Sequence, residues 1–411
     1  MLPKLRALKL LVAILVAAAG WALFVEYSTE HAWWHAAPAP KGDRGAFMRG
    51  VTASLEGHIG NVALILLENS QPIDEYYAST GKAVGRDTAF QVASVSKWIT
   101  AYGVMTLAER GLLDLDAPVS TYLTRWQLPP SAFDHAGVTV RRLLSHTAGL
   151  TDGLGFDFYG PGDTLQSLEA ELTHPRAAPG HEIRVGVAPG SAWRYSGGGY
   201  LLLQLIIEEV ASQPFDAYMQ NAVLEPLGMR RSTFAEEPNL PDVAESFDTS
   251  GTAAPFFRHR AVAAKGLYTT AGDIVRFLLA HTSGEQHKGL ARPAAMRAPN
   301  AWTFGQPVWG LGVALVASAG SDWVIGHGGV AEPAINAEVR LDPTTGDGLV
   351  VLLTGNRNLA TRLAERWVLW RTGKLGLYTM LGLGKAMATG VALGWLAIIV
   401  AGVLLWRRGR I

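Results

Sequence analysis

Residues 91–100, QVASVSKWIT, join a stretch of mixed polarity to an apolar one. Within them, Ser94 and Lys97 are three positions apart, just before a segment in which apolar residues recur at helical spacing. The pattern predicts a helix over residues 98–110, with Gly111 closing its C-terminal end. Three residues are nearly one helical turn, so both polar side chains would share a face. They are either a nucleophile with an activating amine or a helix-capping serine with an unrelated lysine.

The spacing alone does not decide between these two interpretations, because Ser79 and Lys82 have it as well. Ser79 follows a strand-like run and Gly81 predicts a turn, so nothing directs these two side chains toward each other. A lysine beside the Ser94 hydroxyl in a partly dry cleft would have its pKa lowered by desolvation and would share in proton transfer. The start of a helix would also favour negative charge developing beside that serine.

The overall composition excludes several classes of protein. The 411 residues contain no cysteine, which excludes disulfides, thiolate catalysis and cysteine-ligated zinc. Lys plus Arg equals Asp plus Glu, so the chain lacks the basic excess typical of nucleic-acid partners. His31 and His35 have a spacing that suits a metal on a helix, but the sequence around them supplies no third ligand. We therefore predict no nucleic-acid partner and no metal site.

Two apolar segments lie near the ends of the chain. Residues 10–25 have the pattern of a signal peptide or a short signal anchor, and the sequence leaves open which of these they form. Residues 386–406 are uncharged and would cover about 30 Å as a helix, enough to cross a bilayer core. A buried core helix is disfavoured at this length. Basic residues flank the outer sides of both segments: Lys4, Arg6 and Lys9 before the first, and Arg407, Arg408 and Arg410 after the second.

Basic flanks favour the cytoplasmic side of a membrane. The sequence therefore predicts a chain held in the inner (plasma) membrane, with the lipid bilayer as a partner and the part between the spans on the periplasmic, extracytoplasmic side. The expected organisation is a signal anchor or signal peptide over 1–25, a linker over 26–43, a catalytic domain over 44–372, and a C-terminal transmembrane segment with a basic cytoplasmic tail over 375–411.

Strand patterns occur at both ends of the globular part, and helical patterns fill its middle. Residues 61–68 and 74–79 flank a turn and predict a β-hairpin, and further strand-like runs occur between residues 310 and 353. This order predicts an α+β fold, in which an antiparallel β-sheet flanked by helices is closed by segments distant in sequence and carries a mostly helical insertion. An active site would lie between the sheet and the insertion.

A series of motifs in this region resembles the serine β-lactamase and penicillin-binding-protein superfamily, most closely its class C branch, which includes D-aminopeptidases, DD-carboxypeptidases and esterases. The motifs are SVSK at 94–97, LLSHTAGL at 143–150, PG at 189–190 with YSGGGY at 195–200, KGLYTTAGD at 265–273 and GHGG at 326–329. Several motifs in order are far more specific than one. The resemblance covers about residues 45–372 and implies a β-lactamase/transpeptidase-like fold that needs no cofactor.

The resemblance also implies roles for individual residues. Ser94 matches the family nucleophile, Lys97 its partner, and Tyr195 the tyrosine that receives the serine proton or passes it to the leaving group. His327 lies where class C β-lactamases have the lysine of a Lys-Thr-Gly motif. The backbone N–H groups of Ser94 and Val330 would hold the oxyanion.

Three glycines complete the expected site. Gly328 and Gly329 would let a substrate lie close to the strand backbone. Gly197 stands where the family motif has an asparagine, so the amide that holds an acyl-amide side chain is missing. His327, expected to be partly charged at neutral pH, replaces the lysine that attracts a substrate carboxylate. Both departures count against efficient β-lactamase activity and leave acyl-enzyme chemistry possible.

The sequence therefore predicts a membrane-anchored serine hydrolase that acts on ester or amide bonds through Ser94, as an esterase, a D-amino-acid peptidase or a weak β-lactamase. One alternative is a catalytically silent, penicillin-binding-like sensor of cell-wall peptides or β-lactams. The other is a transport or scaffold component, which the two spans suggest.

Overall fold

The computed structural model describes residues 2–152, 158–175, 182–282 and 291–408. The chain divides into two compact units, Val51–Ala364 and the combined terminal segments Met1–Gly50 and Glu365–Ile411. The boundaries between the units fall inside two helices, α2 (Arg44–Leu55) and α11 (Leu359–Thr372).

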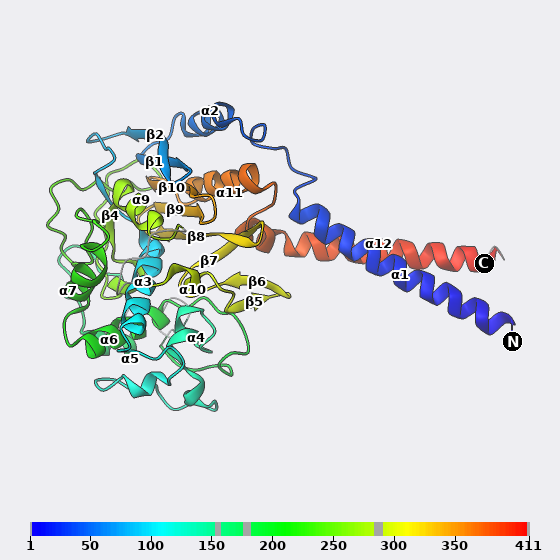
Figure 1. Cartoon of the computed structure of the whole chain (residues 1–411), viewed down its shortest axis with the longest axis horizontal. Helices are drawn as coiled ribbons and strands as arrows, with labels where there is room; N and C mark the ends of the chain where they lie inside the picture. Colours follow the sequence, from blue (N-terminus) through cyan, green and yellow to red (C-terminus); the bar gives the residue numbers. More distant parts are fainter. Residues whose placement is uncertain (1, 153–157, 176–181, 283–290, 409–411) are drawn as a thin grey trace. The chain divides into compact units, whose positions relative to one another are not determined.

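An eight-stranded antiparallel sheet organises the unit Val51–Ala364, with the strand order β2-β1-β10-β9-β8-β7-β6-β5 (Figure 1). The predicted hairpin is formed by β1 (Asn61–Glu68) and β2 (Gln71–Ser79). β1 also pairs with the late strand β10 (Asp347–Thr354), so distant parts of the chain close the sheet. The α+β prediction is confirmed. The other strands of this sheet are β5 (Ala301–Thr303), β6 (Gln306–Trp309), β7 (Ala314–Ala319), β8 (Asp322–Ala331) and β9 (Ile335–Asp342).

The helical part of this unit lies mainly between β2 and β5 in sequence. Its longest helices are α3 (Ser96–Glu109) and α6 (Gly198–Ala211), and β3 (Ala89–Gln91) pairs with β4 (Tyr268–Thr270) in a separate small sheet. Gly111 has φ +71°, the left-handed conformation expected of a glycine that closes a helix. The remaining helices are α4 (Val140–Leu144), α5 (Leu168–Thr173), α7 (Phe215–Met219), α8 (Val262–Lys265), α9 (Ala271–Leu279) and α10 (Pro293–Met296).

β1 and β10 have almost continuous apolar sequences, whereas β9 alternates apolar residues with the buried polar residues Asn336, Glu338 and Arg340. These central strands are covered on both faces. On one face, Ala337 and Val339 of β9 pack in the same core cluster as Trp98 of α3. On the other face, Thr361 of α11 donates a hydrogen bond to Glu338 of β9. The sheet therefore holds β8 and the start of α3 in a fixed relation, and this is where the candidate site lies.

The terminal unit contains a pair of long helices, α1 (Leu2–Glu30) and α12 (Leu377–Arg407), that lie side by side (Figure 1). The indole of Trp21 donates to the Gly390 carbonyl at 3.0 Å, and that of Trp395 donates to the Ala18 carbonyl at 2.9 Å. A side chain at Gly394 would overlap the Trp21 indole, so the glycine permits the close approach.

Leu5–Glu30 and Leu377–Arg407 are long and apolar enough to cross a membrane, judged by length and composition. α1 continues to Glu30, past the predicted limit at residue 25, so the segment without regular structure starts later than the predicted linker. Arg410 of the predicted basic tail lies outside the described residues.

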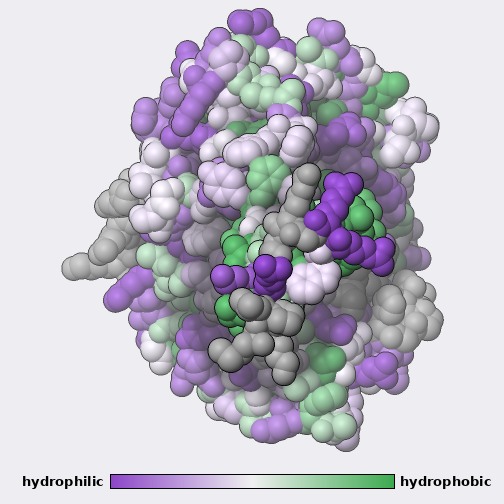
Figure 2. Space-filling view, turned by 90° about the vertical axis from the view of Figure 1, so that its right-hand side faces the viewer, coloured by the Kyte–Doolittle hydropathy of each residue, from purple (hydrophilic) through white to green (hydrophobic). Residues whose placement is uncertain are grey.

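Most exposed large hydrophobic side chains belong to the two terminal helices. Among the described residues of Val51–Ala364, the exposed large hydrophobic side chains are those of Ile59, Leu112, Trp302, Phe304 and Val330. Figure 2 shows a face on which hydrophilic residues surround small groups of hydrophobic ones. The exposed apolar residues are thus concentrated on α1 and α12.

Candidate active site

Ser94 lies in a single turn of 3-10 helix, Ala93–Val95, that leads directly into α3. Ala93 has φ +46°, a conformation that non-glycine residues rarely adopt. The hydroxyl of Ser96 donates to the Ala93 carbonyl at 2.6 Å and accepts from the Leu267 N–H at 3.0 Å, which holds the turn in place. Ser94 is half-buried, while the residues of α3 as far as Leu107 are buried. The turn therefore presents the Ser94 side chain at the edge of a rigid core.

The Lys97 amine lies 3.2 Å from Ser94 Oγ and donates a hydrogen bond to the Ala264 carbonyl at 2.9 Å. Lys97 is fully buried, and this burial holds its pKa well below the ordinary lysine value. The charge of Lys265 acts in the same direction, while that of Asp152 opposes it. A lysine whose neutral form is favoured in this way can accept a proton from the adjacent hydroxyl.

The second pair with the same spacing has a different geometry. Ser79 Oγ donates to the backbone carbonyl of Lys82 at 2.7 Å and also contacts Asn61 Oδ1 at 2.6 Å. The Lys82 amine instead pairs with Asp242 at 2.7 Å. The two side chains do not face each other, as the predicted turn at Gly81 implied.

Tyr195 comes from the loop before α6, and the Lys97 amine lies 5.1 Å from the centre of its ring. The loop is held by Asp152, which accepts hydrogen bonds from Ser196 Oγ at 2.7 Å and from the Gly198 N–H at 2.9 Å. Gly197 forms the N-terminal cap of α6 and contributes no side-chain hydrogen bond. The structure thus brings a phenol beside the amine that contacts Ser94, and the amide expected of an asparagine at 197 is absent.

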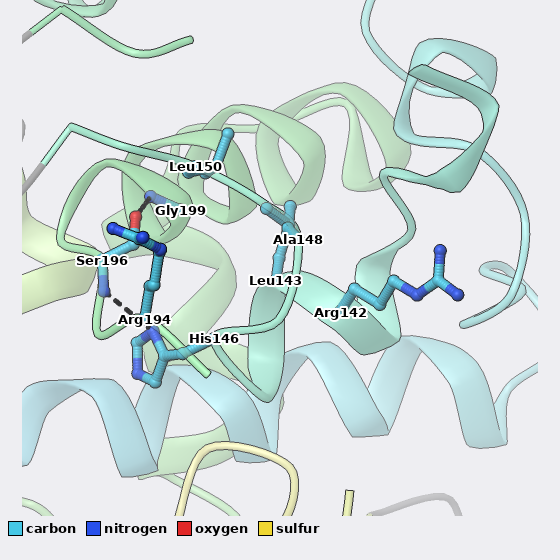
Figure 3. A pocket seen from close by; sticks show the side chains of 8 residues that line it. All are labelled: Arg142, Leu143, His146, Ala148, Leu150, Arg194, Ser196 and Gly199. Carbon is cyan, nitrogen blue, oxygen red and sulfur yellow. Dashed lines mark hydrogen bonds between the residues drawn. The ribbon is translucent and has the colours of Figure 1, made fainter. Parts of the chain in front are cut away.

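His146 packs against Tyr195, with ring centres 4.4 Å apart. Its Nδ1 accepts a hydrogen bond from the Ser196 N–H at 3.1 Å (Figure 3). Burial, reinforced by the charge of Lys97, holds the pKa of His146 well below its ordinary value. The structure shows that the residue it packs on is Tyr195, so His146 supports the candidate site.

Figure 3 shows a small pocket that residues of this loop help to line. The space between its lining side chains is about 160 Å³ and includes open solvent, so it is not an enclosed ligand cavity. Neither Ser94 nor Lys97 lines it, so it is not where a substrate would meet the nucleophile. The lining residues are Arg142, Leu143, His146, Ala148, Leu150, Arg194, Ser196 and Gly199.

His327 on β8 is only 1% exposed and lies beside the rings of Tyr195 and Trp309, with centres 6.3 Å and 5.4 Å away. Its Nδ1–H donates to the Gly328 carbonyl at 2.7 Å, which leaves Nε2 as a possible acceptor. Burial, reinforced by the Lys97 charge, lowers the pKa of His327 to about 3. The expectation of partial charge at neutral pH is therefore wrong. The imidazole is neutral there because aromatic rings from other segments exclude water from it.

Gly329 allows β8 to approach the nucleophile turn. A Cβ at this position would clash with the Val92 carbonyl oxygen and lie 3.0 Å from the Ser94 nitrogen. Gly328 faces the opposite side, where a Cβ would lie 2.5 Å from Glu338 Oε1. Both glycines thus make room for groups of the protein itself, a reason that the sequence did not reveal. Val330, the next residue, is 50% exposed, so this end of β8 is open beside the Ser94 backbone N–H.

A family model described as "Beta-lactamase" matches residues 37–374. The chain belongs to the Beta-lactamase family. Esterase EstB from Burkholderia gladioli is 35% identical over 164 residues, which are 38% of this chain and 40% of EstB. Penicillin-binding protein 4 from Amycolatopsis lactamdurans is 31% identical over 308 residues, which are 69% of this chain and 76% of that protein. The matched part thus spans less than half of EstB.

Solved structures share the fold of this Beta-lactamase family member. The octameric penicillin-binding protein homologue from Pyrococcus abyssi superposes with a TM-score of 0.64 at 21% identity, covering 81% of this chain and 79% of that one. This similarity supports the β-lactamase-like architecture. Together with the esterase named among the relatives, family membership supports a hydrolase.

Two residues near Lys97 were not predicted as part of the site in this Beta-lactamase family member. Asp152, which is fully buried, fixes the Tyr195 loop, and Lys265 adds a second amine. Asp152 follows the LLSHTAGL motif closely and Lys265 begins the KGLYTTAGD motif. Their positions within or beside these motifs were the available signal, but only the fold shows that they approach Lys97.

Proposed function

We propose that this protein is a serine hydrolase that cleaves ester or amide bonds through an acyl-enzyme on Ser94. The observation that carries the proposal is the 3.2 Å separation between Ser94 Oγ and the buried amine of Lys97, with the Tyr195 ring beside that amine. Burial favours the neutral amine, and a neutral amine at hydrogen-bonding distance can act as a general base.

In the acylation step, Ser94 Oγ attacks the carbonyl carbon while its proton passes to Lys97, directly or through Tyr195. The carbonyl electron pair moves onto oxygen, and the backbone N–H groups of Ser94 and Val330 donate hydrogen bonds to the resulting oxyanion. Each such donor contributes about 3 kcal/mol to the transition state. Support for this placement comes from Gly329, whose close packing sets the Ser94 N–H beside the open end of β8.

The tetrahedral intermediate then collapses and expels the alcohol or amine, which takes the proton through Tyr195. A water molecule attacks the acyl-enzyme, gives its proton to the same base, and releases the acid and free Ser94. His146 and Asp152 act as positioning residues, because they contact the Tyr195 ring and its loop. The neutral imidazole of His327 lies beside Tyr195 and adds no charge there. Its Nε2 is available to accept a hydrogen bond.

Esters are the substrates that the site supports best. Gly197 supplies no amide for an acyl-amide side chain, and a neutral His327 supplies no charge for the carboxylate of a β-lactam or a D-Ala-D-Ala peptide. Simple ester cleavage needs neither group. The esterase among the relatives agrees with this choice.

We also propose that α1 and α12 hold the chain in the inner membrane, with the catalytic part on the periplasmic, extracytoplasmic side and lipid around the helices. The reciprocal indole hydrogen bonds of Trp21 and Trp395 support a retained α1. The basic outer flanks support the orientation. Mass spectrometry of the membrane-extracted protein should find the N-terminal segment still attached, and a protein cleaved after residues 17–19 would contradict a retained anchor.

The catalytic proposal is tested with a fluorophosphonate probe, intact-mass analysis and hydrolysis of p-nitrophenyl butyrate. Wild type should take up one probe molecule and release p-nitrophenol, while Ser94→Ala should do neither. Ser79→Ala, the serine of the matched motif, should behave as wild type. If wild type binds penicillin covalently but turns over no ester or amide, the silent sensor is correct. If Ser94→Ala keeps full turnover, the assigned nucleophile is wrong.

A further inference from the structure

β9 carries a line of polar side chains on one face of the sheet. Asn336, Glu338 and Arg340 alternate along the strand and therefore lie on the same side of it. All three are buried, and the Glu338 carboxylate pairs with the Arg340 guanidinium at 2.6 Å. The opposite face of β9 contributes Ala337 and Val339 to the apolar core. Buried polar groups cost free energy unless they are well hydrogen-bonded, so packing alone does not account for this line of residues.

The Asn336 amide connects this face of β9 with α11 and with β8. Its Oδ1 accepts a hydrogen bond at 3.3 Å from the N–H of Thr361, in the first turn of α11, where N–H groups have no partner within the helix. This contact fixes which end of the amide is the NH2 group. Nδ2 donates to Thr361 Oγ1 at 3.2 Å and to the Gly329 carbonyl at 3.5 Å. Thr361 Oγ1 in turn donates to the Glu338 carboxylate at 2.9 Å, so the amide is held from α11 while it contacts β8.

The Gly329 carbonyl belongs to the peptide group that supplies the second proposed oxyanion donor. In a planar trans peptide, the C=O of one residue and the N–H of the next point in opposite directions. The Gly329 carbonyl accepts from Asn336 of β9, so the Val330 N–H points away from β9. Within the described part of the chain, the pairing of β7 with β8 extends only as far as Gly326. The Val330 N–H therefore faces the unpaired edge of β8, where Val330 itself is exposed.

The same peptide group lies against the Ser94 turn. A Cβ at Gly329 would be 3.0 Å from the Ser94 nitrogen, so the two backbone segments approach closely there. The two N–H groups that are proposed to hold the oxyanion thus come from β8 and from this turn. A hydrogen bond weakens steeply when its donor turns out of line, so the orientation of the Gly329–Val330 peptide group affects how well the oxyanion is held.

We propose that Asn336 is a positioning residue for the oxyanion hole. Its amide holds the Gly329–Val330 peptide group so that the Val330 N–H points at the carbonyl oxygen of the substrate. Asn336 acts through this peptide group and not through contact with the substrate. The inference rests on the proposed function, because it assumes an acyl-enzyme on Ser94. It also gives the buried polar line of β9 a use, since Thr361 and Glu338 hold the amide that orients the donor.

The test compares an ester with its thiono analogue in the full-length protein. p-Nitrophenyl butyrate presents an oxygen to the two N–H groups, whereas the thiono ester presents sulfur, a larger atom and a weaker acceptor. In Asn336→Leu, kcat/KM for the oxygen ester should fall by about tenfold, less than the loss of a whole oxyanion donor would cause. The value for the thiono ester should change by less than about twofold, because sulfur gains little from that donor. The ratio of the two values should therefore fall with the oxygen ester.

Asn61→Leu is the matched control. Asn61 is another fully buried asparagine in a strand of the same sheet, and its side chain contacts Ser79 instead of the site. A general loss of packing lowers the turnover of both esters equally, so this variant should keep the wild-type ratio. Asn336→Ser, whose hydroxyl oxygen is one bond closer to the backbone than the amide nitrogen, should lower the ratio as Asn336→Leu does. It decides the matter if the leucine variant does not fold.

The inference is overturned if the Asn336 variants keep the wild-type ratio, or if Asn61→Leu lowers the ratio equally. If wild type shows no Ser94-dependent hydrolysis of the oxygen ester, the proposed function itself fails. That outcome is distinct from Ser94-dependent hydrolysis with a ratio that Asn336 does not affect.

Discussion

The segments Ser79–Lys82 and Ser94–Lys97 have the same residue types at the same spacing and entirely different environments. The Lys82 side chain is 61% exposed and pairs with Asp242, whereas Lys97 is fully buried and contacts Ser94. Ser79 contacts the backbone of Lys82, not its amine. The three-residue spacing allows a serine and a lysine to meet. In Ser94–Lys97 the helical backbone also aligns the two side chains, and burial of the Lys97 amine makes it a base.

The largest predicted effect separates the two lysines. Lys97→Met should lower kcat/KM for p-nitrophenyl butyrate by about 10³-fold, the usual size of a general-base contribution. Lys82→Met should change it by less than twofold, because its amine lies at the surface and does not contact a serine. Both variants should be soluble and folded by circular dichroism. Equal losses in the two variants would show that burial does not distinguish the motifs.

A smaller effect is expected when a methyl group is added beside each serine. At Gly329 the new Cβ meets the Val92 carbonyl and the Ser94 nitrogen, both backbone atoms of the strained turn. Displacing that turn should lower kcat by about tenfold to a hundredfold in Gly329→Ala. At Gly81 the nearest atom is the carboxylate end of Glu245, a flexible side chain. Gly81→Ala should therefore keep kcat within about twofold of wild type. Matching losses would mean that β8 does not position Ser94.

Local patterns in the sequence were sufficient to predict the hairpin that ends at Ser79 and the helix that follows Ser94. Alternation and a turn predict the hairpin of β1 and β2, and helical spacing predicts α3, which Gly111 closes. The short strands β5 and β6 were not predicted, because three or four residues carry too little periodicity and β6 contains Pro307. Motif order then made the relation of Ser94 to Tyr195 predictable.

The charges within the site could not be predicted in the same way. The neutrality of His327 depends on Trp309 and Tyr195, which reach it from other segments. The roles of Gly328 and Gly329 depend on Glu338 and on the Ser94 turn. Burial and close approach are properties of the assembled fold, so residue type alone suggests which group can titrate but not whether it does.

The pH dependence of activity should show which group titrates in the Ser94 site. If the reaction needs neutral Lys97, kcat/KM falls as pH is lowered through the depressed pKa of that amine, which then becomes protonated. His327, with a pKa of about 3, stays neutral from pH 5 to 8 and contributes nothing to this acid limb. His327→Gln should therefore keep the shape of the profile while changing its height. Loss of the acid limb in this variant would assign the titration to His327 and contradict its burial.

The smallest predicted effect concerns the stability that the Ser79–Lys82 segment contributes to the folded protein. The Lys82–Asp242 pair is partly solvated on both sides, so Lys82→Met should reduce the free energy of unfolding by at most about 1 kcal/mol at pH 7, measured by urea denaturation. The Lys82 and Thr88 hydrogen bonds depress the pKa of Asp242, so the stabilisation is present above the unfolded aspartate pKa. It should disappear as pH falls through the lower folded value, and the two proteins should then unfold at the same urea concentration. A cost well above 1 kcal/mol would show that this pair is a structural element of the fold and that the two motifs differ in more than burial.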